Sequence, residues 1–124
     1  LRYGRRNTGN RATDLADYTL ECMRRGGIYD QIGGGFHRYS VDRFWLVPHF
    51  EKMLYDNALL ALTYLEGYQA LKKPEYLKTA THTLDYILCE MTSPERGFLS
   101  AEDAGEVGKE GEFYVWTKGE LQSL

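Results

Sequence analysis

The sequence predicts an all-α fold made of α/α hairpins, with short β-hairpins in the connecting loops. Three stretches place apolar residues at the three- and four-residue spacing of helices. Glycine or proline interrupts the chain after each of these stretches. The intervening segments that favour strands hold only a few residues each, which suits loop hairpins rather than an extended sheet.

The 124 residues are 43% hydrophobic and 27% charged, as in an ordinary globular protein. This length allows one domain, so we expect residues 1–124 to lie within a single domain. The net charge of −3 argues against a nucleic-acid partner, because phosphate binding requires a surplus of basic side chains.

The cellular location is predicted from the apolar runs, the first residues and the cysteines of the chain. Its longest apolar run, Leu59–Leu62, is too short to span a membrane, and the first residues lack a signal-peptide pattern. Cys22 and Cys89 have no metal-site spacing and suit free thiols of a reducing compartment. We therefore expect a cytoplasmic protein with no membrane partner and no cofactor.

The first helix is predicted over Thr13–Arg25. Leu15, Thr19 and Met23 recur at helical spacing and form one stripe. Gly26 follows, and glycine accepts the left-handed conformation that commonly ends a helix.

A long loop follows from Gly26 to Pro48. Two short segments in it, Phe36–Tyr39 and Phe44–Val47, favour strands and predict a hairpin with its turn around Ser40–Arg43. Long loops inside compact domains are uncommon unless they carry a function. We therefore expect the chemistry of the chain between Gly26 and Asn57.

The second and third helices are predicted to form one hairpin. Phe50–Leu71 is apolar around nearly its whole circumference, which predicts burial on every side. Pro74–Met91 is amphipathic and has one polar face, and Lys72–Lys73 joins the two. An inner and an outer helical layer would produce this pattern.

A second loop hairpin is predicted beyond Ser93–Pro94, with strand-forming residues in Gly97–Ser100 and Glu112–Thr117. Thr117 and Glu120 then carry the capping signature of a new helix. Because the chain stops soon afterwards, the apolar second helix would be left partly uncovered, and we expect self-association of the chain.

The candidate catalytic residues are two histidines and two carboxylates of the first loop, namely His37, His49, Glu51 and Asp56. Histidine exchanges protons near neutral pH, and a carboxylate can orient it, so these residues supply the parts for general acid/base catalysis. A histidine hydrogen-bonded within a loop, or one capping a helix, explains the same pattern without a function. The two carboxylates could pair with Arg38 and Lys52, although we favour a wet pocket.

Further residues could bind a substrate through charge or through stacking against aromatic rings. They are Arg38, Tyr39, Trp45, Tyr55, Glu102, Asp103 and Trp116. For Glu102 and Asp103, which lie in an acidic run, solvated surface is the simpler interpretation. No metal site is supported, since His49-Phe-Glu51 lacks the second histidine of the helical zinc motif.

Four runs carry a resemblance to a known family: GGIYDQIGGGFHRYSVD from Gly26, WLVPHFEKMLYDNA from Trp45, GFLSAEDA from Gly97 and EGEFYVWT from Glu110. They closely resemble the thioredoxin-domain-containing family that includes spermatogenesis-associated proteins. Members have an N-terminal thioredoxin-like domain followed by a six-hairpin (α/α) barrel similar to that of N-acylglucosamine 2-epimerases. The resemblance implies that this chain is an early part of that barrel, without the thioredoxin-like domain.

The similar barrels imply two chemistries by analogy. Histidines in the epimerases move a proton beside a carbonyl group, a role that His37 and His49 would suit. Related glycosidases use paired carboxylates, which Glu51, Asp56, Glu102 and Asp103 could provide.

We therefore expect part of a barrel with a carbohydrate-type pocket and sugar epimerase- or isomerase-like chemistry, although this piece alone should be inactive. The alternatives are a glycosidase-like hydrolase and a non-catalytic binding or structural domain. Unpaired His37, His49 and Glu51 in a hollow would favour an enzyme, and complete internal pairing a structural role.

Overall fold

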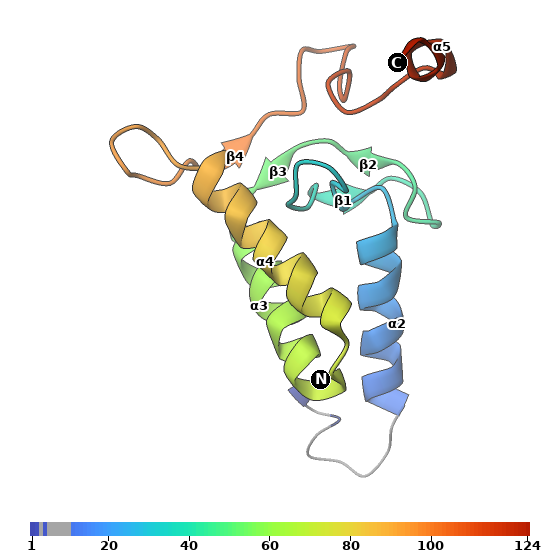
Figure 1. Ribbon diagram of the computed structural model, residues 1–124, viewed down its shortest axis with the longest axis vertical. Helices are drawn as coiled ribbons and strands as arrows, with labels where there is room; N and C mark the ends of the chain where they lie inside the picture. The colour runs from blue at the N-terminus through green and yellow to red at the C-terminus, as the bar shows by residue number, and fades with distance from the viewer. Residues whose placement is uncertain (3, 5–10) are drawn as a thin grey trace.

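A computed structural model describes residues 1–2, 4 and 11–124 of the chain. The described elements run in the order α2 (Arg11–Arg25), β1 (Tyr39–Ser40), β2 (Pro48–His49), β3 (Lys52–Met53), α3 (Leu54–Leu71), α4 (Pro74–Cys89), β4 (Ala101–Glu102) and α5 (Lys118–Ser123). Helices α2, α3 and α4 lie side by side, and the loops and short strands form a layer over one end of them (Figure 1). The mostly helical fold with loop hairpins is confirmed.

Helix α2 begins two residues before its predicted start and ends where the glycine pair predicts. The backbone N–H of Gly26 still donates to the carbonyl of Cys22 at 2.9 Å, which closes the last turn. Among the helices that the structure describes, none is long and apolar enough to cross a lipid bilayer.

The first loop hairpin is present, but its strands lie further along the chain than predicted. Tyr39 pairs with His49 and Ser40 with Pro48 in antiparallel register. The predicted strand Phe44–Val47 is wrong, because the Asp42 carboxylate accepts hydrogen bonds from backbone N–H groups of this segment. Those bonds curl the segment into a loop.

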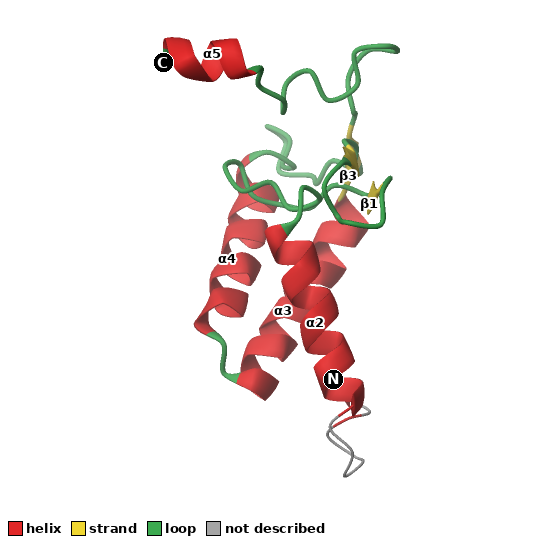
Figure 2. Cartoon of the chain, turned by 90° about the vertical axis from the view of Figure 1, so that its right-hand side faces the viewer, coloured by secondary structure: helices red, strands yellow, loops and turns green. Residues whose placement is uncertain are grey.

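Helix α3 begins at Leu54, four residues after its predicted start, because Lys52 and Met53 form β3 and pair with β4. Its predicted burial on every side is also wrong for this chain. One face packs inward, whereas Leu59 is 63% and Leu62 50% exposed. Within the described residues, α2 and α4 cover only part of the circumference (Figure 2).

Helix α4 begins at Pro74 as predicted and ends at Cys89, two residues early. The turn before it contains Lys72 in the left-handed conformation. The helix is amphipathic as predicted, since Tyr76, Ala80 and Ile87 are buried, although the apolar Leu84 is exposed.

The predicted strand over Glu112–Thr117 is wrong. The segment forms turns, and the partner of β3 is Ala101–Glu102 instead. The predicted capping signature is confirmed, because Thr117 and Glu120 form the reciprocal cap of α5, a helix of 6 residues. In both views α5 lies beyond the loop layer, away from α2, α3 and α4 (Figures 1 and 2).

Candidate functional site

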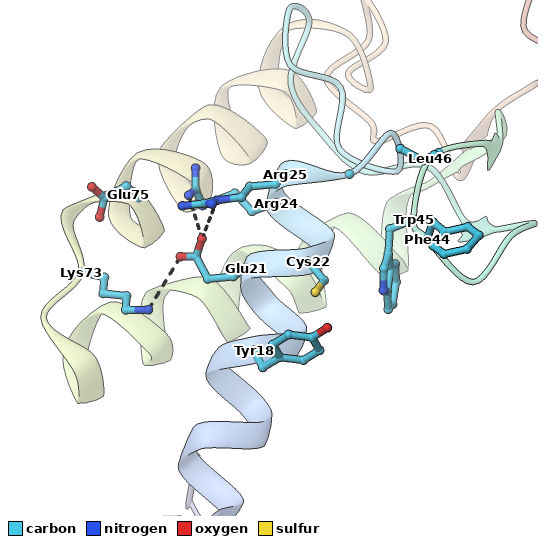
Figure 3. Close-up of a pocket in the computed structure, with 11 residues that line it drawn as sticks. Tyr18, Glu21, Cys22, Arg24, Arg25, Phe44, Trp45, Leu46, Lys73 and Glu75 are labelled. Atoms are coloured by element: carbon cyan, nitrogen blue, oxygen red, sulfur yellow. Dashed lines mark hydrogen bonds and ion pairs between the residues drawn. The ribbon is translucent and has the colours of Figure 1, made fainter.

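A large hollow of about 640 Å³ runs along the C-terminal half of α2. Several of its charged side chains are already paired, since Glu21 lies 2.9 Å from Arg24, 3.0 Å from Arg25 and 3.9 Å from Lys73. Figure 3 shows this carboxylate between the cations on one side of α2, with Trp45 on the other side. No candidate acid or base lines this hollow among the described residues.

A second hollow, of about 530 Å³, collects several of the candidate site residues. It lies between the end of α2, the β1–β2 hairpin and the first half of α3. Five candidates line it: His37, Arg38, Tyr39, Trp45 and Asp56. The remaining lining residues are Met23, Ile28, Ser40, Asp42, Arg43, Leu59, Leu60 and Thr63. We refer to it as the His37 pocket.

The imidazole of His37 is held in one orientation. Its Nδ1 lies 2.9 Å from the carbonyl oxygen of Phe50, and because a carbonyl can only accept, Nδ1 carries the proton. The neutral ring then has an unprotonated Nε2. Burial lowers the pKa of His37, as does the nearby Lys52 charge, and the Phe50 hydrogen bond and two carboxylates oppose them only in part.

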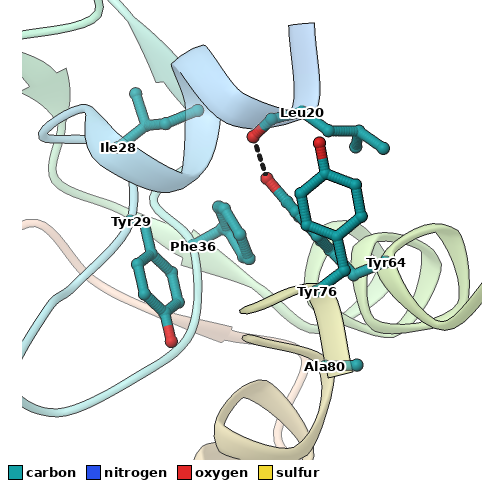
Figure 4. Packing of buried hydrophobic residues seen from close by; sticks show 7 residues of the cluster. All are labelled: Leu20, Ile28, Tyr29, Phe36, Tyr64, Tyr76 and Ala80. Carbon is teal, nitrogen blue, oxygen red and sulfur yellow. Dashed lines mark hydrogen bonds between the residues drawn. The ribbon is translucent and has the colours of Figure 1, made fainter. Parts of the chain in front are cut away.

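Asn57 fixes the backbone beside His37. Its Oδ1 accepts from the N–H of Phe36 at 2.6 Å, and its Nδ2 donates to the carbonyls of Phe36 at 3.1 Å and Met53 at 2.9 Å. The Phe36 ring lies in the core between Tyr29 and Tyr64 (Figure 4). The segment before His37 is therefore fastened to both the core and the first turn of α3.

Asp56, on that first turn, differs from the other candidate carboxylates. Within the described part of the chain its carboxylate makes no hydrogen bond, although it faces the His37 pocket. Burial raises the pKa of Asp56, and the negative charge of Glu51 raises it further, while the positive charge of Arg38 lowers it.

Arg38, Glu51 and His49 form a linked group at the pocket rim. The Arg38 guanidinium donates to Glu51 Oε2 at 2.9 Å. The same oxygen lies 3.8 Å from Nδ1 of His49, which is buried and has no hydrogen-bond partner. The His49 ring stacks on Tyr39 with centroids 5.0 Å apart.

The other four candidates occupy different positions. Tyr55 is exposed and lies beside Arg38. Glu102 and Asp103 line a separate hollow of about 300 Å³ with Glu106, Lys109, Glu112 and Phe113. Trp116 is exposed and lines neither hollow.

Lys52 is a central residue of this region that sequence reasoning placed only as a possible carboxylate partner. It is 1% exposed, and its Nζ donates to Asp30 Oδ2 at 2.8 Å and to the carbonyl of Gly34 at 3.0 Å. Burial would raise the pKa of Asp30, but the ammonium and backbone N–H groups lower it below its ordinary value. The only signal in the sequence was a lysine between the apolar residues Phe50 and Met53.

The fold places the chain in the class of α/α-hairpin proteins, and the comparisons with known proteins agree. It matches a solved structure of D-mannose isomerase with a TM-score of 0.63 and 15% identity, over 78% of this chain and 25% of that one. At this identity the likeness shows the fold alone, that of an α/α-barrel enzyme.

The relatives of this chain include proteins named spermatogenesis-associated protein 20. The human protein is 48% identical over 122 residues, and the mouse protein 45%. An uncharacterised protein of Caenorhabditis elegans is 37% identical over 129 residues. These matches cover 94–95% of this chain but only 15–18% of each relative, so the chain spans about a sixth of their length. No protein-family model matches the chain.

Proposed function

We propose that this chain is part of the six-hairpin barrel of a thioredoxin-domain-containing protein, and that its His37 pocket contributes to a sugar isomerase- or epimerase-like site. One observation carries the proposal. His37, whose neutral ring has an unprotonated Nε2, and Asp56, whose carboxylate makes no hydrogen bond among the described residues, both line one hollow with Tyr39 and Trp45. The fold shared with a D-mannose isomerase supports it.

The chemistry needs a base and an acid on one substrate. Isomerisation and epimerisation of a sugar both begin when a base removes a proton from the carbon beside the carbonyl group. His37 Nε2 has the lone pair for that step. Asp56, which lines the same pocket, would deliver a proton to the carbonyl oxygen, so that charge does not accumulate there.

The residues at the rim would support this step. Tyr39 and Trp45 offer ring faces to the apolar face of a sugar. His49 would become a second proton carrier if its Nδ1 closed the 3.8 Å separation from Glu51, and such contacts commonly tighten when substrate binds.

The experiment uses a full-length relative, assayed for interconversion of D-mannose and its ketose. Replacing the residues that align with His37 by alanine, or with Asp56 by asparagine, should lower kcat about 10²- to 10⁴-fold. An asparagine at the position of Asp103 is the matched control, since Asp103 lies in another hollow. Unchanged turnover in the first two variants would remove the assignment.

A non-catalytic role is the second candidate, because much of the polar group is internally paired. Arg38 pairs with Glu51, and Lys52 with Asp30. Such networks can be rigid and carry no chemistry. A domain of this kind would not interconvert D-mannose and its ketose, so the same assay distinguishes the two candidates.

A hydrolase with paired carboxylates has less support. Both oxygens of Glu102 accept hydrogen bonds from tyrosine hydroxyls, of Tyr86 at 2.5 Å and of Tyr114 at 3.0 Å. Glu51 is engaged by Arg38, which leaves Asp56 as the one candidate carboxylate in the His37 pocket.

A further inference from the structure

Tyr114, from a distant part of the chain, packs with Phe50 against the imidazole of His37. We call the side of the imidazole that Tyr114 covers its rear. The ring of Tyr114 meets the imidazole edge-on, with centroids 4.6 Å apart and planes at 87°. It also stacks on Phe50 at 5.7 Å and 9°. Tyr114 therefore contacts both the imidazole and the residue whose carbonyl accepts its Nδ1–H.

Tyr114 is itself held from two directions. Its hydroxyl donates to Glu102, whose second oxygen accepts from Tyr86 on α4. Before it in the chain, Gly111 has a φ of 79°, and a Cβ there would lie 2.2 Å from the Phe50 ring. Only glycine lets the backbone pass so close.

The charges around this cluster are fixed as well. Lys52 Nζ lies 5.0 Å from the centroid of Tyr114 and 4.3 Å from that of Tyr86. Asp30 and Glu102 are the carboxylates that act on His37 electrostatically, together with the Lys52 ammonium. Burial, reinforced by Glu102, raises the pKa of both tyrosines, so that they stay protonated and keep donating.

We propose that Tyr114 is a positioning residue for His37, which keeps water from the rear of the imidazole and so holds its Nδ1–H on the Phe50 carbonyl. Without the ring, water could donate to that carbonyl and accept from the imidazole, and both neutral tautomers would form. This arrangement would keep Nε2 of His37 unprotonated for use in the pocket, and that purpose rests on the proposed function.

The test is ¹⁵N NMR of the chain with labelled histidine, which reports tautomer and pKa directly. Tyr114→Ala should convert His37 from one neutral tautomer to a mixture, and should raise its pKa toward the ordinary 6.5 because the ring becomes hydrated. Tyr114→Phe keeps the ring and should keep the tautomer. Phe113→Ala, at an 86% exposed neighbour, is the matched control and should change neither quantity.

An unchanged tautomer and pKa in a folded Tyr114→Ala chain would overturn the proposal. If circular dichroism shows that this variant does not fold, Tyr114→Leu and Gly111→Ala decide instead. Tyr114→Leu shortens the side chain so that it no longer covers the imidazole, and Gly111→Ala displaces the segment from Phe50. Each should therefore admit water and produce the same mixture. A single tautomer in both would equally overturn it.

Failure of the proposed function is detected separately. Titrating wild-type chain with D-mannose shows whether the pocket binds a hexose, whereas the tautomer of His37 is measured without sugar. If the wild-type chain binds no hexose, but Tyr114→Ala loses the single tautomer, the proposed function is refuted and the positioning role of Tyr114 stands.

Discussion

At the scale of single residues, buried polar side chains fix the geometry of the candidate site. Asn57 has no exposed surface and uses both side-chain groups to bind the backbone of Phe36 and Met53. Removing such a group leaves buried backbone donors and acceptors without partners.

Asn57→Ala should therefore lower the free energy of unfolding by about 2–3 kcal/mol, measured by urea denaturation. It should also broaden the NMR signals of His37, whose preceding residue loses its anchor. Gln69→Ala, at an exposed amide on the same helix, should change stability by less than about 0.5 kcal/mol. Equal effects of the two variants would contradict this account of Asn57.

The buried imidazole makes stability depend on pH. Its pKa in the folded chain is lower than the 6.5 of the unfolded chain. Unfolded chains then take up a proton that folded chains do not, so stability falls as pH decreases from 6.5 through the folded-state pKa. Above 6.5 this contribution is constant.

His37→Gln should reduce the loss of stability between about pH 7.5 and about pH 5.5, because the neutral amide can still donate to Phe50 but does not titrate. Urea midpoints at the two pH values, for wild type and variant, measure this difference. An equal loss in both proteins would show that His37 does not carry the dependence.

The residue types of the site could be predicted from sequence, but not all of their partners. Histidines, acids and aromatic residues gathered in one loop are visible without a fold. The burial of Lys52 is not, because its partners Asp30 and Gly34 meet it only through the folded loop. The contact of Tyr114 with His37 depends likewise on the path of the C-terminal segment.

At the scale of elements, β3 is the clearest departure from the predicted pattern. Phe50–Met53 continues the apolar spacing of α3, so periodicity alone extends the helix through it. The pairing of Lys52 and Met53 with Glu102 and Ala101 overrides that preference. The local sequence around Lys52 cannot show that it pairs with a strand so far along the chain.

Lys52 fastens this strand to the glycine-rich loop, and the two sides of the ion pair can be separated by mutation. Lys52→Met should destabilise the chain by about 3–5 kcal/mol, because Asp30 is left buried without its cation. Adding Asp30→Asn should recover a large part of that loss by removing the unpaired charge. Urea unfolding of the single and double variants measures both, and additive losses would contradict the pairing.

At the scale of the whole molecule, the order of helices and loops could be predicted, but the environment of α3 could not. Its apolar residues surround the helix, and this pattern alone predicts burial on every side. In this chain α4 packs along one side of it, and α2 meets it where the Tyr64 hydroxyl donates to the Leu20 carbonyl (Figure 2). The relatives are about six times as long as this chain, and the matching barrel structure is about three times as long.

The exposed leucines of α3 predict self-association of the isolated chain. Leu59, Leu62 and Leu65 lie on one uncovered side, and contiguous apolar surface of this kind drives contact between copies. Light scattering at micromolar concentration should show species larger than a monomer. Leu62→Glu should shift them toward monomer, whereas Lys78→Glu on the exposed face of α4 should not. A strictly monomeric wild-type chain would contradict the prediction.

The central claim, that the His37 pocket receives a sugar, is tested most directly by NMR titration of this chain with D-mannose. We expect the signals of His37, Tyr39 and Asp56 to shift together and saturate with one dissociation constant, while the signals of Glu21 and Lys73, in the hollow along α2, stay unchanged. Signals that do not move, or that move only outside the His37 pocket, would contradict it.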